Sequence, residues 1–331
     1  MRSMFLGLIA AILAPTLAIA ACDPGEERIR FSHVTAAQGH PKGEAALLLE
    51  QRINRELNGR ACMEVFARST LFNDDDVLPA MLRGEVEMAA PSLSKFEAYT
   101  RKFRVFDLPF MFEDVFAVEE FQYSPEGEAL KRSMEAQGLI GLEFWHNGMK
   151  QISATRPLIS PTDAAGMKFR IQPSPVLNAQ MEALGSAGVA MPFSAVYEAL
   201  KNGEVQGQEN TWSNIYTQSF HTVQDGVTET NHGIIDYLVV TSADWWNGLE
   251  PGLHADLAQI LLEVTHERNR FAFEIGEMNR SRIMADGGVI RELTPEQRAE
   301  WVAAFAPVWD QFRGDIGDDL IAAAERAQGG F

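Results

Sequence analysis

Positive charge is scarce in this sequence of 331 residues. It contains 28 Lys and Arg against 46 Asp and Glu, which gives a formal net charge of −18 at pH 7. Such an excess of negative charge repels phosphate backbones and anionic membrane surfaces, so we expect no nucleic acid as a partner. An anionic ligand would have to be held by a few local cations against the field of the whole chain.

Motifs of the common enzyme classes are also missing. The 7 histidines and 2 cysteines form neither HExxH nor CxxC, and the sequence contains no GxSxG and no GxGxxG. We therefore expect no metal, no cofactor and no catalytic activity. A secreted enzyme that uses carboxylates and histidines in a cleft is the alternative from another functional class.

Long hydrophobic runs are absent after the N-terminus. Residues 1–21 combine the positive charge of Arg2 with an apolar segment at 5–14 and small residues at 18–20. This pattern is typical of a cleaved secretory signal peptide, so we expect an exported, periplasmic protein. The longest later apolar stretch, residues 234–240, is too short to span a bilayer.

Only two cysteines occur, Cys22 and Cys62. In an oxidising compartment they can form a disulfide, because Cys22 precedes the strand-like segment 28–34 and Cys62 opens another at 62–66. The sequence Ile19-Ala-Ala-Cys22 also resembles a lipoprotein processing site, which would make Cys22 a lipidated N-terminus. The spacing alone leaves both interpretations open.

Strand-like and helix-like segments alternate along the chain, which indicates an α/β fold with parallel strands. One unit occurs twice: GEVEMAAPS at 84–92 and GEVQGQENT at 203–211 each follow an apolar helical segment. Glycine just after a helix end can adopt the left-handed conformation. Two copies of this helix–Gly–strand unit indicate two similarly built lobes. Their strand ends would face each other across a cleft.

Ligands of such sheets bind at the carboxyl ends of the strands. Alternation in the segment 166–172 puts Arg170 on the face opposite Phe169, near the end of a strand, where its planar guanidinium can pair with a carboxylate. A structural or surface arginine is the alternative for that position. Further candidates lie at other strand ends or beside the lobe boundary, and each has a solvent or core role as its alternative: His33, Arg68, Ser92, Lys150, Glu209, Asn210 and Trp212.

Several longer segments resemble one family, the solute-binding proteins of tripartite ATP-independent periplasmic (TRAP) transporters. They cover nearly the whole chain after the signal peptide and occur in the family's order: FSHV…HPKG (31–43), STLFNDD (69–75), APSLSKF (90–96), FDLPFMF (106–112), GMKFRIQPS (166–174) and GQENTWSNIY (207–216). The last two are most similar to the branch for C4-dicarboxylates such as succinate, malate and fumarate.

The resemblance implies a two-lobed periplasmic binding protein fold (type II-like), with crossing strands and long C-terminal helices. Lobe I would comprise 22–147 plus 236–275, and lobe II would comprise 148–235 plus 276–331. A small organic acid would bind between the lobes, and a membrane-embedded permease would be the protein partner. A sugar-acid binder of the same family is the alternative.

The resemblance also implies roles for individual residues. Arg170 would pair with a ligand carboxylate, Asn210 would orient the ligand, and Lys150 would supply a second cation. Contacts from the first lobe would come from around His33, Arg68 and Ser92. The sequence departs from the family pattern at Ala67-Arg68, where many relatives carry Pro-Asn, so that end of the pocket is the least defined.

Overall fold

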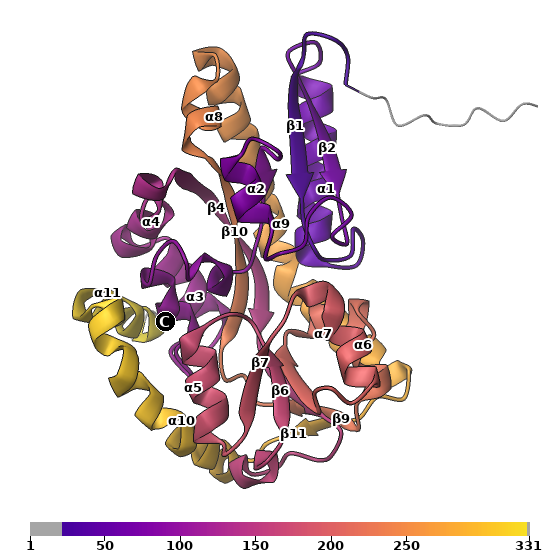
Figure 1. The fold of residues 1–331 in the computed structure, drawn as a ribbon, viewed down its shortest axis with the longest axis vertical. Helices are drawn as coiled ribbons and strands as arrows, with labels where there is room; N and C mark the ends of the chain where they lie inside the picture. The colour runs from indigo at the N-terminus through magenta and orange to yellow at the C-terminus, as the bar shows by residue number, and fades with distance from the viewer. Residues whose placement is uncertain (1–21, 330–331) are drawn as a thin grey trace, which may run out of the picture.

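A computed structural model describes residues 22–329, so the predicted signal peptide at 1–21 lies outside the described residues. Two β-sheets lie one beyond the other along the long axis of the molecule (Figure 1). The first sheet has the order β2-β1-β3-β10-β4, and the second has the order β11-β9-β5-β8-β6-β7. The chain is thus a two-lobed α/β protein, as the sequence predicted.

The strands are short except where they cross between lobes. Those of the first sheet are β1 (Glu27–Ser32), β2 (Ala61–Phe66), β3 (Met88–Ala89), β4 (Leu139–Met149) and β10 (Ile234–Ser242). Those of the second sheet are β5 (Gln151–Ala154), β6 (Lys168–Ile171), β7 (Ala187–Ala190), β8 (Gly207–Asn210), β9 (Gly226–Glu229) and β11 (Ile290–Glu292).

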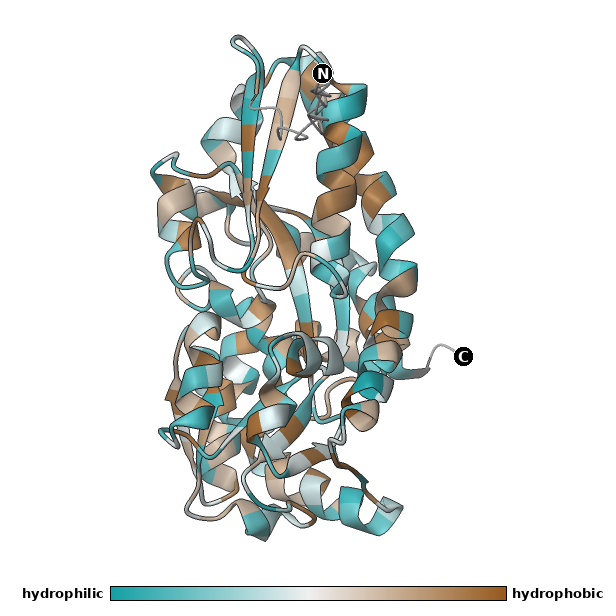
Figure 2. Ribbon diagram, turned by 90° about the vertical axis from the view of Figure 1, so that its right-hand side faces the viewer, coloured by the Kyte–Doolittle hydropathy of each residue, from teal (hydrophilic) through white to brown (hydrophobic). Residues whose placement is uncertain are grey.

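Helices flank both sheets. They are α1 (Pro41–Glu56), α2 (Val77–Leu82), α3 (Val115–Gln122), α4 (Pro125–Lys131), α5 (Pro175–Ala183), α6 (Val196–Lys201), α7 (Trp212–Thr217), α8 (Ala243–Gly248), α9 (Pro251–Ala285), α10 (Pro295–Ile316) and α11 (Asp318–Arg326). Hydrophobic and hydrophilic residues are interspersed along the long helices in Figure 2, as expected for helices with one face against a core. Within residues 22–329, no helix is both long and apolar enough to cross a membrane.

The expected parallel pairing holds for part of each sheet, because both sheets are mixed. Strand β1 pairs in parallel with β2 and β3, and β6 pairs in parallel with β7 and β8, as predicted. Strand β10, however, runs antiparallel to β3 and β4, and β5 runs antiparallel to β8 and β9. The reversal arises because β5 and β10 belong to the chain segments that pass between the lobes.

Several segments connect the lobes. Strand β4 continues into β5 with only Lys150 between them, and β10 returns from the second lobe to the first. Helix α9 spans both cores, because Leu257 packs in a hydrophobic cluster of the first lobe and Ile283 in one of the second. The lobe boundaries themselves stay a prediction.

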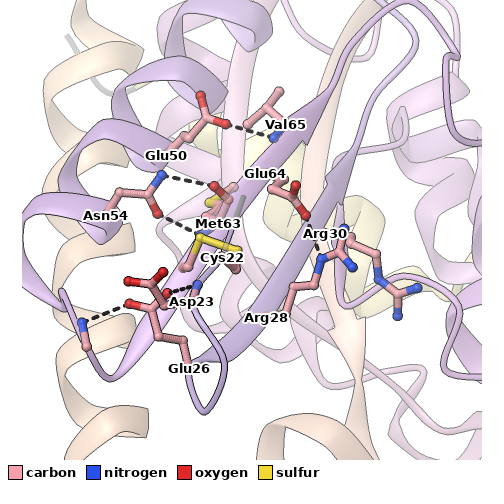
Figure 3. The surroundings of a disulfide bond; sticks show 12 residues. Cys22, Asp23, Glu26, Arg28, Arg30, Glu50, Asn54, Met63, Glu64 and Val65 are labelled. Atoms are coloured by element: carbon pink, nitrogen blue, oxygen red, sulfur yellow. Dashed lines mark hydrogen bonds and ion pairs between the residues drawn. A yellow bond between two sulfur atoms is a disulfide. The ribbon is translucent and has the colours of Figure 1, made fainter. Parts of the chain in front are cut away.

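Cys22 and Cys62 form the predicted disulfide. Figure 3 shows it at the start of the described chain, where it ties the segment before β1 to β2. Lipid attachment would require the same Cys22 sulfur, so this disulfide and a lipidated Cys22 exclude each other. It lies near the amino ends of these parallel strands, since Cys62 is paired in register with Arg28, whereas the carboxyl ends point towards the second lobe.

Candidate functional site

A small cavity lies between the two lobes, at the carboxyl ends of β1, β3, β6 and β8. Polar side chains from both lobes dominate its walls. The first lobe contributes Val34, Thr35, Lys42, Asp74 and Ser92, β10 contributes Ile235 and Tyr237, and the second lobe contributes Arg170, Gln172, Phe193, Asn210 and Asn214. The location agrees with the expectation for α/β sheets that the strand ends form the site.

Arg170 is the central cation of the second-lobe wall. It is only 1% exposed, and its strand neighbours Phe169 and Ile171 are buried in the hydrophobic core of that lobe. Its Nε and Nη2 atoms donate to the carbonyl oxygen of Met191 at 3.2 and 2.9 Å, which fixes the orientation of the guanidinium. Burial lowers the pKa of Arg170 from its ordinary value, and the nearby carboxylate of Asp74 opposes that shift. The guanidinium stays cationic, because arginine does not lose its proton in proteins.

Lys42 is a second buried cation, on the first-lobe wall, and is not among the site residues predicted from the sequence. Its Nζ atom donates to the carbonyl oxygen of Ala90 at 2.9 Å and lies 3.6 Å from the centroid of the Tyr237 ring. Burial lowers the pKa of Lys42 to about 7, and Asp74 opposes this shift. The available signal was its place in the first turn of α1, directly after the loop that follows β1.

Hydrogen bonds join the two walls. Ser92 Oγ donates to Gln172 Oε1 at 2.7 Å, and the backbone N–H of Phe193 donates to Asp74 Oδ1 at 3.1 Å. His40 Nε2 lies 2.8 Å from Asn214 Oδ1. These three contacts hold the lobes in a closed arrangement around the cavity.

A chain of side-chain amides fixes the polar floor of the cavity. Asn214 Nδ2 donates to Asn210 Oδ1 at 2.6 Å, and Asn210 Nδ2 donates to Gln208 Oε1 at 3.0 Å. Tyr237 is held by Asn147, whose Nδ2 donates to the phenolic oxygen at 2.9 Å. Burial raises the pKa of Tyr237, so its phenol stays neutral at physiological pH. The floor therefore presents fixed neutral dipoles to the cavity.

Lys150 and Glu209 lie behind this floor and do not line the cavity. Lys150 Nζ pairs with Glu209 Oε2 at 2.8 Å, and His232 Nε2 lies 2.9 Å from the same oxygen. All three side chains are buried. Burial raises the pKa of Glu209, but the attraction of Lys150 and the hydrogen bond with His232 outweigh that effect and bring the pKa to about 2. In this cluster the charges of Lys150 and Glu209 are already paired with each other, at the point where β4 passes into β5.

The remaining sequence candidates are scattered. His33 is buried and lines a small neighbouring cavity that shares Lys42 with the first. Arg68 is exposed, with a left-handed backbone at φ 53°. Trp212 is buried and faces a separate surface hollow, with the guanidinium of Arg280 centred 5.7 Å from its ring. The structure therefore brings Arg170, Asn210 and Ser92 into one cavity, and it places the other candidates outside that cavity.

The described residues offer little to a metal ion. Within 22–329, the one cluster of three potential ligand atoms consists of Cys22, Glu26 and Cys62, and its two sulfurs are bonded to each other. A disulfide sulfur is not the thiolate that binds metals.

Comparisons with known proteins place this geometry among solute-binding proteins. Residues 31–315 match the family described as bacterial extracellular solute-binding protein, family 7. The C4-dicarboxylate-binding periplasmic protein DctP of Vibrio cholerae is 58% identical over 319 residues, which cover 96% of each chain.

Solved structures show the same architecture. A TRAP periplasmic solute-binding protein from Shewanella oneidensis with bound succinate superposes with a TM-score of 0.90 and is 42% identical, covering 92% of this chain and 99% of that one. The sugar acid binding protein DctPAm of Advenella mimigardefordensis, in complex with galactonate, has a TM-score of 0.88 at 25% identity, with coverage of 92% and 100%.

Proposed function

The chain belongs to the bacterial extracellular solute-binding proteins of family 7, and from that premise we propose that it captures a C4-dicarboxylate such as succinate, malate or fumarate between its lobes. The observation that carries the proposal is the buried Arg170 on the wall of the interlobe cavity. The greater similarity to a succinate-bound protein than to a galactonate-bound one supports a dicarboxylate over a sugar acid.

In this proposal Arg170 binds one ligand carboxylate. Two of its N–H groups are held by the Met191 carbonyl, so the guanidinium is oriented before the ligand arrives. A planar guanidinium can make two parallel charge-assisted hydrogen bonds to a carboxylate. Asn210 and Asn214, from the cavity floor, orient the ligand through their amides.

Binding is coupled to closure of the lobes. The cavity takes its walls from both lobes, so a ligand that touches both walls binds the closed form better than the open one. A ligand shifts such an equilibrium only by its difference in affinity for the two forms. The closed, loaded protein would then deliver the acid to a membrane permease from the periplasm. No covalent bond is broken in this cycle, so no catalytic group is required.

A ligand screen tests the proposal. The exported chain is unfolded, refolded to remove bound ligand, and heated with succinate, malate, fumarate, galactonate, or the neutral diamide succinamide. A ligand at 100 times its dissociation constant stabilises the folded form by about 2.7 kcal/mol, enough to raise the melting temperature by several degrees. We expect the three dicarboxylates to raise it and succinamide not to. A shift with galactonate alone would replace the dicarboxylate by a sugar acid, and no shift with any acid would overturn the proposal.

A further inference from the structure

The cavity presents two cations on opposite walls, although the chain as a whole carries a net charge of −18. Arg170 comes from the second lobe and Lys42 from the first, and each is 1% exposed. A single carboxylate held by Arg170 would leave the second cation without a counter-charge.

The one carboxylate that lines the cavity does not neutralise this pair. Asp74 is already paired with Lys95, whose Nζ lies 3.1 Å from Asp74 Oδ2, and its other oxygen accepts the N–H of Phe193 at 3.1 Å. Lys95 is itself buried. Lys95 also pairs with the more exposed Asp75 at 2.6 Å, so two carboxylates share it. Within the described residues neither Asp74 nor Asp75 forms an ion pair with Lys42 or Arg170, so both cations of the cavity lack a carboxylate partner.

Lys42 is also short of partners of its own. Among residues 22–329, no carboxylate oxygen lies within 4.0 Å of its Nζ, whose contacts are the Ala90 carbonyl and the face of the Tyr237 ring. A buried ammonium without a counter-ion is costly, and the cost falls when an anion arrives beside it. The cavity therefore lacks a negative group beside the Nζ atom of Lys42.

We propose that Lys42 binds the second carboxylate of the ligand and is the residue that makes the protein select dicarboxylates over monocarboxylates. This inference rests on the proposed function. The ligand lies with one carboxylate at Arg170 and the other at Lys42, and so links the two lobes by charge. An acid with one carboxylate satisfies Arg170 but leaves Lys42 unpaired.

The test compares succinate with its monoamide succinamate, which has almost the same shape but one carboxylate. Titration calorimetry gives both dissociation constants for the wild-type chain and for Lys42→Gln, which can still donate to the Ala90 carbonyl. We expect the wild type to prefer succinate by roughly 30-fold or more, the usual effect of unpairing a buried charge. In Lys42→Gln the dissociation constants of succinate and succinamate should differ by no more than about threefold, mainly because succinate binds more weakly than it does to the wild type.

Lys131→Gln is the matched control, because Lys131 is also mostly buried but is paired, outside the cavity, with Glu128 on α4 and Glu143 on β4. It should leave the succinate to succinamate ratio unchanged. A preference that survives in Lys42→Gln, or an equal loss on both ligands, would overturn the inference and leave the proposed function standing. If Lys42→Gln fails to fold, a wild-type preference below about threefold overturns the inference by itself. A wild-type chain that binds no dicarboxylate would overturn the proposed function.

Discussion

Ser92 in the first lobe donates a hydrogen bond of 2.7 Å from its Oγ atom to Oε1 of Gln172 in the second lobe. Ser92 follows β3 and Gln172 follows β6, so the bond joins the ends of two strands across the cavity. Both residues also line that cavity. One of the contacts that hold the lobes closed is therefore next to the proposed ligand.

Removing this bond should weaken ligand binding without unfolding the protein. In Ser92→Ala, Gln172 loses its buried partner only in the closed state, at a cost of about 1–2 kcal/mol. We expect succinate to bind roughly 5- to 30-fold more weakly by calorimetry. Ser94→Ala is the matched control, since Ser94 loses a bond of equal length to Asp107 outside the cavity. Equal affinity in Ser92→Ala and the wild type would show that the bond does not contribute to closure.

Lys150→Met should act on stability rather than on affinity. It leaves the buried carboxylate of Glu209 without its cation, which typically costs about 3–5 kcal/mol. We expect a lower melting temperature and a succinate affinity within about threefold of wild type. Adding Glu209→Gln removes the unpaired charge and should restore part of the stability. A Lys150→Met chain that melts normally but binds no succinate would instead support the ligand role predicted from the sequence.

The disulfide should stabilise the fold and leave the site unaffected. It closes a segment with a sequence separation of 40 residues, for which the loss of chain entropy in the unfolded state is worth about 3–4 kcal/mol. The double variant Cys22→Ser/Cys62→Ser should melt several degrees lower and bind succinate as the wild type does. A reductant should lower the wild-type melting temperature only. The prediction fails if the variant and the wild type melt together.

Succinate affinity should fall as the pH rises above neutrality. Burial lowers the pKa of Lys42 to about 7 without ligand, and a carboxylate beside it would raise that pKa. Only the protonated form attracts the carboxylate, so the affinity is fully present below pH 7 and declines by up to about tenfold per pH unit above it.

Calorimetry at pH 6.5, 7.5 and 8.5, in buffers of different ionisation enthalpy, measures this decline and the proton uptake that accompanies it. Lys42→Gln should show neither. A constant wild-type affinity over that range would contradict the assignment. The other titratable or charged groups around Lys42 are His33, His40, Asp74, Arg170 and Tyr237.

Local signals in the sequence were sufficient for much of the fold. Gly84 and Gly203, the glycines of the repeated unit, both adopt a left-handed backbone with φ 73° at the ends of their helices. Thr294 and Gln297 form the reciprocal capping hydrogen bonds that open α10. Such features depend on neighbouring residues, so the sequence contains them directly. The parallel cores of both sheets followed from the same strand–helix alternation.

The site was harder to predict, because it is formed by contacts between residues that are distant from each other in the sequence. Local pattern predicts a solvated lysine in the first turn of α1, and only the packing of Ala90 and Tyr237 around Lys42 buries it. Lys150 follows a strand end and looks like a ligand contact, but it pairs with Glu209, 59 positions further along the chain. Arg170 could be placed in advance because strand alternation and family resemblance agreed on it.

The most direct test of the account is a calorimetric titration of succinate into refolded wild type, Arg170→Gln and the control Arg298→Gln, whose arginine is exposed on α10. We expect wild type and Arg298→Gln to bind alike, and Arg170→Gln to bind roughly 100-fold more weakly or not at all, because the ligand carboxylate loses its buried partner. Circular dichroism and melting curves would confirm that all three chains are folded. An affinity of folded Arg170→Gln within a few-fold of wild type would contradict the capture of a dicarboxylate through Arg170.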